Sequence, residues 1–452
     1  MGKELLSVGL DVGTTSTQMI LSKLTAENRA SAFAVPKMEI TEREVLYRGP
    51  VHFTPLSAHN RVDGAALRTL IEAEYAAAGI TRQQVDTGAV IITGETSRKE
   101  NAQTVLAQLS DLAGDFVVAT AGPDLESVLA ARGAGAVERS AGKRVLHMDI
   151  GGGTSNLCLL EDGKILATGC LNVGGRLLKF DENGSITYRS PVLEGITDLQ
   201  VGDKPTADQI TQLAATLVSA LEMAAGLLPP TDLLEKLTTR ETGRTWQIPA
   251  EVIPSFSGGV ADCIATDYPE LAFGDIGPAL GRAIRSSRLC SGEYYLGTET
   301  IRATVIGAGC HSTTLSGSTV FHQNITFPLK NIPAAVAENP STPEDVRRAL
   351  SQLDGPIGVL AVPGYGSPSY EQVKTLARVI AEGMGGAPLL VCLQQDMAKA
   401  LGHCLRLLAP QAKILCMDGL ALEPGSFLDV GAPVGPALPV VIKTLVLSGG
   451  NT

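Results

Sequence analysis

The sequence predicts an α/β protein that contains two related domains and an additional α/β region. A short apolar run followed by a Gly/Thr-rich segment occurs twice, and the two copies are 138 residues apart (149 − 11). After each copy, strand-length apolar runs alternate with helix-length amphipathic runs. A repeat of this length indicates a duplicated domain. We therefore expect domains at residues 1–143 and 144–300, followed by a third region at residues 301–452.

Composition limits the class of protein. Of 452 residues, 44% are hydrophobic and 18% are charged, so the chain can bury large apolar cores and is not disordered. The net charge of −11 and the lack of Lys/Arg clusters argue against general nucleic-acid binding. Neither a secretory signal nor an apolar run of about 18 residues is present, so we expect a cytoplasmic protein without a membrane span. The eight scattered cysteines are expected to be reduced core thiols.

The first domain begins with a hairpin. The residues after Thr17 form another strand-length run, so the Gly/Thr segment is a turn between two strands. The two common nucleotide loops that open a helix, G-x-G-x-x-G and G-x-x-x-x-G-K-[ST], do not fit. Further elements are expected as strands at 45–53, 89–93 and 116–119 and helices at 63–78 (ending at Gly79), 102–112 and 125–131.

The second domain repeats the hairpin from Val145. Thr206 and Gln209 form a capping-box pattern at the start of a helix. A strand at 252–253 leads to Ser257-Gly258-Gly259, and a Gly/Ala-rich helix at 273–284 suits close packing at a hinge. In the third region we expect strands near 303 and at 358–361, 389–393, 413–417 and 440–447, helices from 343, 370 and 396, and a strand turn at 307–314, where a further anion loop is the alternative.

The two hairpin tips carry the residues that we expect to bind phosphate and metal. Backbone N–H groups and hydroxyls converge at such a tip, and glycines let the backbone approach an anion closely. Each preceding strand carries an aspartate near its end, Asp11 or Asp149, whose oxygens suit Mg²⁺. One such segment is often only a turn, but two copies at equivalent places indicate a function. The candidate phosphate-binding residues are Gly13, Thr14, Thr15, Gly151, Gly152, Gly153 and Thr154.

The order of these features resembles a known superfamily. Two phosphate hairpins, a Gly-Gly pair between a strand and a helix, and small-residue helices resemble the actin, Hsp70 and sugar-kinase ATPases. The segments GLDVGTTSTQMILSKL, MDIGGGTSNLCLL, SFSGGVAD and FGDIGPALGRAI more closely resemble the ethanolamine ammonia-lyase reactivating factors, a family called ethanolamine utilisation protein A. This resemblance runs through nearly the whole chain, to the closing segment IKTLV at 442–446.

The resemblance implies a duplicated actin-like ATPase fold with a cleft between two lobes. It also implies an ATP-dependent chaperone that releases damaged cobalamin from its partner, ethanolamine ammonia-lyase, so that intact adenosylcobalamin can bind. On this basis Asp11 and Asp149 hold Mg²⁺, the hairpin residues contact the phosphates of ATP or ADP, and Gly258 and Gly259 border the nucleoside. An association with a bacterial microcompartment comes only from the family, and homo-oligomer formation stays open.

The sequence offers one candidate for the catalytic carboxylate and more than one reaction. Glu95 follows a predicted strand and could orient the attacking water, or it could simply stabilise a helix N-terminus. Its segment loosely resembles exopolyphosphatases, so a phosphohydrolase is an alternative. A small-molecule kinase and a nucleotide-dependent scaffold without significant turnover are further alternatives. The lack of a basic channel argues against a long polyanionic substrate.

Cobalamin itself is not expected to bind tightly to this chain. The pattern D-x-H-x-x-G is absent, and none of the six histidines lies in it. His147, two residues before Asp149 on a predicted core strand, is expected to be a packed histidine. The partner enzyme should therefore hold the cofactor, and we expect part of the region after residue 300 to contact that enzyme.

Overall fold

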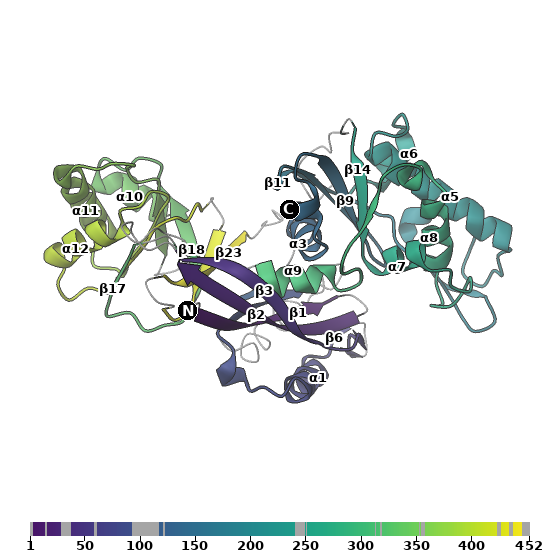
Figure 1. Cartoon of the computed structure of the whole chain (residues 1–452), viewed down its shortest axis with the longest axis horizontal. Helices are drawn as coiled ribbons and strands as arrows, with labels where there is room; N and C mark the ends of the chain where they lie inside the picture. Colours follow the sequence, from purple (N-terminus) through teal and green to yellow (C-terminus); the bar gives the residue numbers. More distant parts are fainter. Residues whose placement is uncertain are drawn as a thin grey trace.

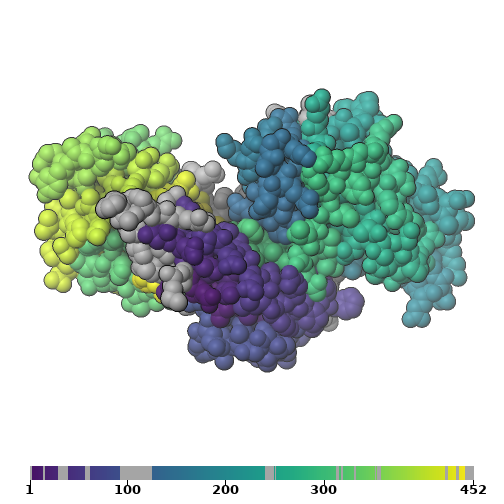
Figure 2. Space-filling view, viewed as in Figure 1, coloured from purple at the N-terminus to yellow at the C-terminus, as the bar shows by residue number. Residues whose placement is uncertain are grey.

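The computed structural model contains three large β-sheets that follow one another along the chain (Figure 1). It describes residues 3–13, 16–28, 38–57, 61–92, 117–120, 123–239, 249, 251–311, 313–316, 319–351, 353, 358–422, 426–433 and 437–444. We call the segments that form these three sheets the first, second and third parts of the chain. The first part lies between the second and third parts and packs against both (Figure 2). In the ranges just given, no helix combines the length and apolar character needed to cross a membrane.

The first sheet has the strand order β3-β2-β1-β7-β8, with β4 beside β2. β1 pairs antiparallel with β2 and parallel with β7, so the predicted hairpin is confirmed. Along β1, Val8 and Leu10 pack towards α1, whereas Gly9 and Asp11 face the other side. The bounds are β1 (Lys3–Val12), β2 (Ser16–Asn28), β3 (Met38–Arg48), β4 (His52–Phe53), β5 (Leu56–Ser57), β6 (Arg61–Val62), α1 (Gly64–Ala77), β7 (Thr87–Ile92) and β8 (Val117–Thr120).

The second sheet repeats this plan, with the strand order β11-β10-β9-β14-β15. β9 pairs antiparallel with β10 and parallel with β14. Leu146 and Met148 of β9 pack into a core with α5, α7 and α8, so His147 and Asp149 face the opposite side. The bounds are α4 (Ala136–Arg139), β9 (Arg144–Ile150), β10 (Ser155–Glu161), β11 (Lys164–Leu171), β12 (Leu178–Phe180), β13 (Ile186–Arg189), α5 (Ala207–Ala224), α6 (Asp232–Leu237), β14 (Ile253–Ser257), α7 (Gly259–Ala265), α8 (Gly277–Arg285) and β15 (Tyr295–Leu296).

Two helices cross between these sheets. α3 (Pro123–Gly133) follows β8 but packs on β9, β10 and β11, whereas α9 (Ala303–His311) follows β15 but packs on β1, β2 and β7. A Cβ atom at Gly133 would lie 1.9 Å from the Ala303 carbonyl oxygen, and one at Gly307 would lie 2.0 Å from the Leu129 carbonyl oxygen. Only glycine therefore permits this close crossing. The face of the first sheet that α9 covers and the face of the second sheet that α3 covers are thus joined through this helix pair. We call these the inner faces of the two sheets.

The third sheet has the order β16-β23-β22-β18-β19-β20-β21-β17, with parallel pairing from β18 to β21. Helices α10, α11 and α12 share one core over this parallel part. Leu315 packs near Leu5 and Leu24 of the first part. The bounds are β16 (Thr313–Leu315), β17 (Val320–Gln323), β18 (Leu329–Val336), α10 (Pro343–Leu350), β19 (Val359–Val362), α11 (Tyr370–Met384), β20 (Leu389–Leu393), α12 (Ala398–Leu408), β21 (Ile414–Met417), β22 (Ser426–Val430) and β23 (Pro439–Thr444).

Several local predictions are confirmed. α1 ends before Gly79, whose φ of +71° is the left-handed conformation that favours glycine. Thr206 and Gln209 form the predicted capping box of α5. All eight cysteines are free, and burial raises the pKa of the Cys158 thiol to about 12.

The prediction was wrong for residues 301–314. In place of a strand and a turn or anion loop, the chain forms α9 and then β16. Every residue from Ala303 to Cys310 is buried, so the run lacks the polar face that marks a surface helix. The Gly/Ala-rich helix α8 does pack closely, since a Cβ at Gly281 would lie 2.4 Å from the Cys263 Cβ. α8 packs on α5 and α7 within the second part of the chain.

Two other predictions need comment. The strand expected at 45–53 is divided into β3 and β4, because the chain turns between Arg48 and His52. The helix expected at 102–112 lies outside the described residues.

Candidate functional site

The two Gly/Thr hairpins have the same local geometry. In the first, the Gly13 amide donates to the Ser16 carbonyl at 2.8 Å. In the second, the Gly151 amide donates to the Thr154 carbonyl at 2.9 Å. These pairs are related by the same 138-residue offset as Asp11 and Asp149 (151 − 13). The sequence repeat is therefore a structural repeat. Thr14 and Thr15 lie outside the described residues.

Asp11 and Asp149 occupy equivalent places in the first and second parts of the chain. Each is the next-to-last residue of the first strand of its hairpin, and each faces the crossing of α3 and α9. Glu126, in the first turns of α3, lies close enough to both aspartates for their charges to raise its pKa. The crossing thus places a third carboxylate, which the sequence did not identify, within electrostatic range of the two predicted ones.

Glu126 has the environment of a functional acid. Burial, followed by the nearby charges of Asp11 and Asp149, raises its pKa well above the ordinary range, and a hydrogen bond with Asn156 partly opposes this. A carboxylate among the small and apolar residues of the predicted helix at 125–131 was the available signal. The predicted candidate, Glu95, lies outside the described residues, so its role remains a prediction.

Asp149 is fixed by hydroxyls from two elements. Ser257, at the end of β14, donates to Asp149 Oδ1 at 2.5 Å, and Thr304 of α9 donates to Oδ2 at 3.4 Å. Burial raises the pKa of Asp149 to about 6, while these two hydrogen bonds lower it. Ser257 therefore orients the carboxylate and stabilises its charge.

His147 extends this hydrogen-bonded chain. It is completely buried, as predicted, but it is not only a packing residue. Its Nε2 lies 2.9 Å from Ser257 Oγ and its Nδ1 lies 3.1 Å from Ser255 Oγ. Burial lowers the pKa of His147 to about 3, so the ring is neutral. Because Ser257 gives its only proton to Asp149, His147 Nε2 must carry a proton and Nδ1 must accept one from Ser255.

The second hairpin tip is braced by the following loop. The amide of Arg176 donates to the Gly152 carbonyl at 2.6 Å, and a Cβ at Gly152 would lie 3.2 Å from Arg176 Cδ. The Arg176 guanidinium lies 3.3 Å from Asp275, which holds a cation beside the glycine tip. A Cβ at Gly153 would meet no atom within 4 Å, so this backbone is open to a ligand.

The two glycines of the Gly-Gly pair differ in the space around them. Gly258 has φ +83°, and a Cβ there would lie 2.3 Å from the Ile150 carbonyl oxygen, so the backbone itself requires glycine. A Cβ at Gly259 would approach only Ile301, at 3.9 Å. Gly259 is thus the member of the pair with space beside it.

The donor set fits Mg²⁺ held through few protein ligands. In the described ranges, no three His, Cys, Asp or Glu side chains are grouped closely enough to enclose a metal ion. Mg²⁺ usually binds through one or two carboxylates and keeps water and phosphate ligands. Asp11 and Asp149 supply carboxylates of this kind.

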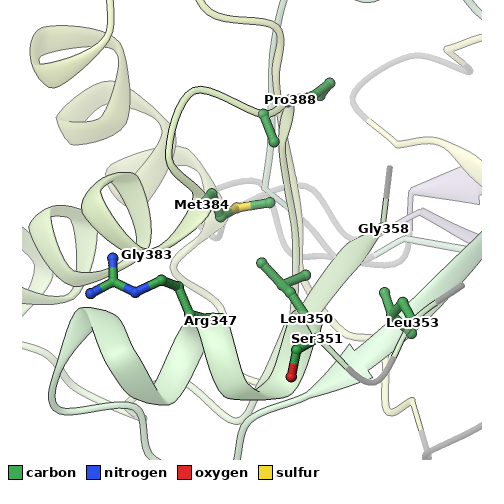
Figure 3. Close-up of a pocket in the computed structure, with 9 residues that line it drawn as sticks. Arg347, Leu350, Ser351, Leu353, Gly358, Gly383, Met384 and Pro388 are labelled. Atoms are coloured by element: carbon green, nitrogen blue, oxygen red, sulfur yellow. The ribbon is translucent and has the colours of Figure 1, made fainter. Parts of the chain in front are cut away.

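A separate cavity of about 290 Å³ lies in the third part of the chain (Figure 3). Leu350, Leu353 and Met384 line it, near the ends of α10 and α11. Arg347 and Ser351 also line it, so its lining is mixed, and neither Asp11 nor Asp149 contributes to it.

Comparison with known proteins identifies the family. A family model described as "Ethanolamine utilisation protein EutA" matches residues 3–448. The chain belongs to this family. A relative named ethanolamine ammonia-lyase reactivase EutA, from Salmonella typhimurium, is 39% identical over 467 residues, and the alignment covers 98% of each chain. The relative of the same name from Escherichia coli is 40% identical over 472 residues, also with 98% of each chain covered.

Solved structures show weaker similarity. The ethanolamine utilization protein EutJ from Carboxydothermus hydrogenoformans is 17% identical, with 67% of this chain and 89% of that chain covered and a TM-score of 0.32. A Ppx/GppA phosphatase from Aquifex aeolicus is 12% identical, with 68% and 99% covered and a TM-score of 0.41.

Proposed function

We propose that this chain is an ATP-dependent chaperone that reactivates ethanolamine ammonia-lyase. It would release damaged cobalamin so that intact adenosylcobalamin binds to the lyase. The observation that carries this proposal is the identity of 39% and 40% to two relatives named as reactivases, over 98% of each chain. In this proposal the nucleotide lies between the two hairpins, whose aspartates both face the crossing of α3 and α9.

ATP binds between the two Gly/Thr hairpins in this proposal. The cation of Arg176 lies beside the second tip, the backbone at Gly153 is open to a ligand, and Gly259 has open space for the nucleoside. Asp11 and Asp149 would hold Mg²⁺, which supplies charge neutralisation at the phosphates when bound. Thr14, Thr15 and Thr154 complete the proposed phosphate contacts.

Glu126 is the proposed catalytic carboxylate. It lies near both aspartates, and phosphoryl transfer to water needs chiefly a well-positioned nucleophile and charge stabilisation. Glu126 would hold the attacking water and the Asn156 amide would orient Glu126. We expect Glu126→Gln to slow ATP hydrolysis by about 100-fold or more while ATP still binds.

A matched control separates this role from a general effect of charge removal. Glu138, on α4 of the same part of the chain, is exposed, and Glu138→Gln should hydrolyse ATP at the wild-type rate. Wild-type turnover by Glu126→Gln would contradict the assignment and leave Glu95 as the candidate catalytic carboxylate. ATP binding without turnover in the wild type would favour a scaffold.

Nucleotide state would change how the first two parts of the chain are held together. The crossing helices connect them, and Arg48 of β3 lies 2.6 Å from Glu299, just before α9. Loss of the γ-phosphate would remove contacts that link the two hairpins. A reactivase needs nucleotide states that differ in affinity for its partner, since only that difference can drive cofactor release. We propose that the third part contacts the lyase.

The reactivation test uses the full chain and lyase inactivated with damaged cobalamin. Turnover is measured after adding fresh adenosylcobalamin, with and without Mg-ATP. We expect recovery only when the chain and Mg-ATP are both present. ATP hydrolysis without any recovery would contradict the reactivase proposal and leave a kinase or phosphohydrolase activity to be tested.

A further inference from the structure

Each site aspartate has a side-chain amide beside it. Gln18 is the direct partner of Asp11 across β1 and β2, and Asn156 is the direct partner of Asp149 across β9 and β10. In both hairpins the amide follows the aspartate by the same seven positions (18 − 11 and 156 − 149). Directly opposed residues of an antiparallel pair project to the same face, with Cβ atoms about 5 Å apart. Both amides therefore belong to the inner faces that meet at the crossing.

Both amides bury a hydrogen-bond acceptor that the chain does not use. Gln18 is 4% exposed and Asn156 is 2% exposed. Their nitrogens have partners, because Gln18 Nε2 donates to the Ile301 carbonyl at 3.3 Å and Asn156 hydrogen-bonds Glu126. Among the described residues, however, Gln18 Oε1 and Asn156 Oδ1 have no hydrogen-bond partner. An unsatisfied buried carbonyl destabilises the folded chain, so two at equivalent places point to donors that come with a ligand.

The chemistry of the expected ligand identifies those donors. An ATP phosphate at neutral pH offers acceptor oxygens and cannot satisfy a carbonyl. Water bound to Mg²⁺ is a strongly polarised donor, and Mg²⁺ retains several such waters in proteins. The lack of three closely grouped ligand side chains in the described ranges agrees with a water-rich metal site.

We propose that Gln18 and Asn156 accept hydrogen bonds from the water molecules that hydrate the divalent cation at Asp11 and Asp149. This inference rests on the proposed metal-nucleotide site and adds the residues that hold the water ligands of its cation. The two amides are positioning residues, because they contact the hydration water of the cation and not the cation itself. They would hold the same hydrated ion from the first and second parts of the chain.

The test measures metal affinity without turnover. Mn²⁺ serves as the probe, and the free ion is followed by electron paramagnetic resonance with saturating ADP. Gln18→Met keeps the side-chain length but removes the amide, both its unpaired carbonyl and the Nε2 donor to Ile301, and we expect the Kd for Mn²⁺ to rise about tenfold, as for other changes to residues that position metal ligands. ADP affinity in EDTA should stay unchanged. Asn156→Leu should weaken Mn²⁺ binding in the same way.

Two further variants control for folding and for chemistry. Gln18→Glu keeps an acceptor oxygen and should bind Mn²⁺ at least as tightly as the wild type. Gln323, on β17, donates to the carbonyls of Pro410 and Ala412, and Gln323→Met should leave Mn²⁺ affinity unchanged. Thermal melting of the metal-free proteins should show that Gln18→Met is folded, since the substitution removes one unsatisfied carbonyl together with one hydrogen bond, from Nε2 to the Ile301 carbonyl.

The outcomes distinguish this inference from the proposed function. Wild-type Mn²⁺ affinity in folded Gln18→Met and Asn156→Leu would overturn the role of the amides but leave the metal-nucleotide site in place. A wild-type protein that binds no Mn²⁺ with ADP would overturn both.

Discussion

Ser257 Oγ lies 2.5 Å from Asp149 Oδ1, and the same hydroxyl lies 2.9 Å from His147 Nε2. A serine between a buried histidine and a buried carboxylate fixes the direction of each proton in the chain. The carboxylate that we assign to the metal is therefore oriented from β14, two strands away from the hairpin partner Asn156.

Ser257→Ala should weaken the site through Asp149. Removal of the donor leaves Asp149 Oδ1 buried without its short hydrogen bond, and we expect Mn²⁺ affinity with ADP to fall about tenfold. Ser255 reaches only the other nitrogen of His147, so Ser255→Ala is the matched control and should cost less. Equal effects of the two substitutions on Mn²⁺ affinity would contradict a specific role of Ser257.

His147 should be a neutral ring with its proton on Nε2. Burial lowers its pKa to about 3, and Ser257 donates to Asp149, which leaves Nε2 as the donor to Ser257. Nitrogen-15 NMR of the imidazole at neutral pH distinguishes the two tautomers and the charged form. A proton on Nδ1, or a doubly protonated ring, would show that the hydrogen bonds run in the other direction.

Gly307→Ala should destabilise the crossing of α3 and α9. The new Cβ would lie 2.0 Å from the Leu129 carbonyl oxygen, so the helices must move apart. Overpacking typically costs about 1–3 kcal/mol, and the free energy of unfolding in urea measures it. At exposed Gly292 a Cβ would meet no atom within 4 Å, so Gly292→Ala is the control. Equal stability of the two variants would contradict the close crossing.

His311 should make the protein less stable in mild acid. Burial, with the nearby charges of Arg43 and Arg132, lowers its pKa to about 4. Between about pH 6.5 and 4 the unfolded histidine binds a proton that the folded one does not, so stability falls as pH falls. His311→Gln should reduce this loss, measured by urea unfolding across that range.

The control for this prediction is His403→Gln, at an exposed position of α12. Burial of Asp149 acts in the opposite direction between about pH 3.8 and 6, but it is common to all the variants and cancels in the comparison. A pH dependence that is unchanged by His311→Gln would contradict the assignment.

Local patterns predicted the repeated parts of the fold well. Asp11 and Asp149 could be found because the same strand-turn-strand pattern occurs twice, and the Asp63–Gly79 helix has clear end signals. α9 could not be found, because a helix buried on all sides has no amphipathic period. Its small residues serve a contact with α3, which is distant in sequence.

The same limit applies to the site. Glu126 comes near Asp11 and Asp149 only because α3 leaves the first sheet and packs on the second. The partners of His147 lie on β14, more than 100 residues away in the chain (108 for Ser255 and 110 for Ser257). No spacing within a short segment reports such contacts, which depend on tertiary packing.

The central claim is that one metal-nucleotide site, built by the first and second parts of the chain, drives reactivation of ethanolamine ammonia-lyase. The most direct measurement is recovery of turnover by cobalamin-inactivated lyase, with Mg-ATP and fresh adenosylcobalamin, for the wild type, Asp11→Asn and Asp149→Asn. We expect the wild type to restore turnover and both folded variants to fail, because each removes one carboxylate from the shared site. Full recovery with either variant would contradict the claim.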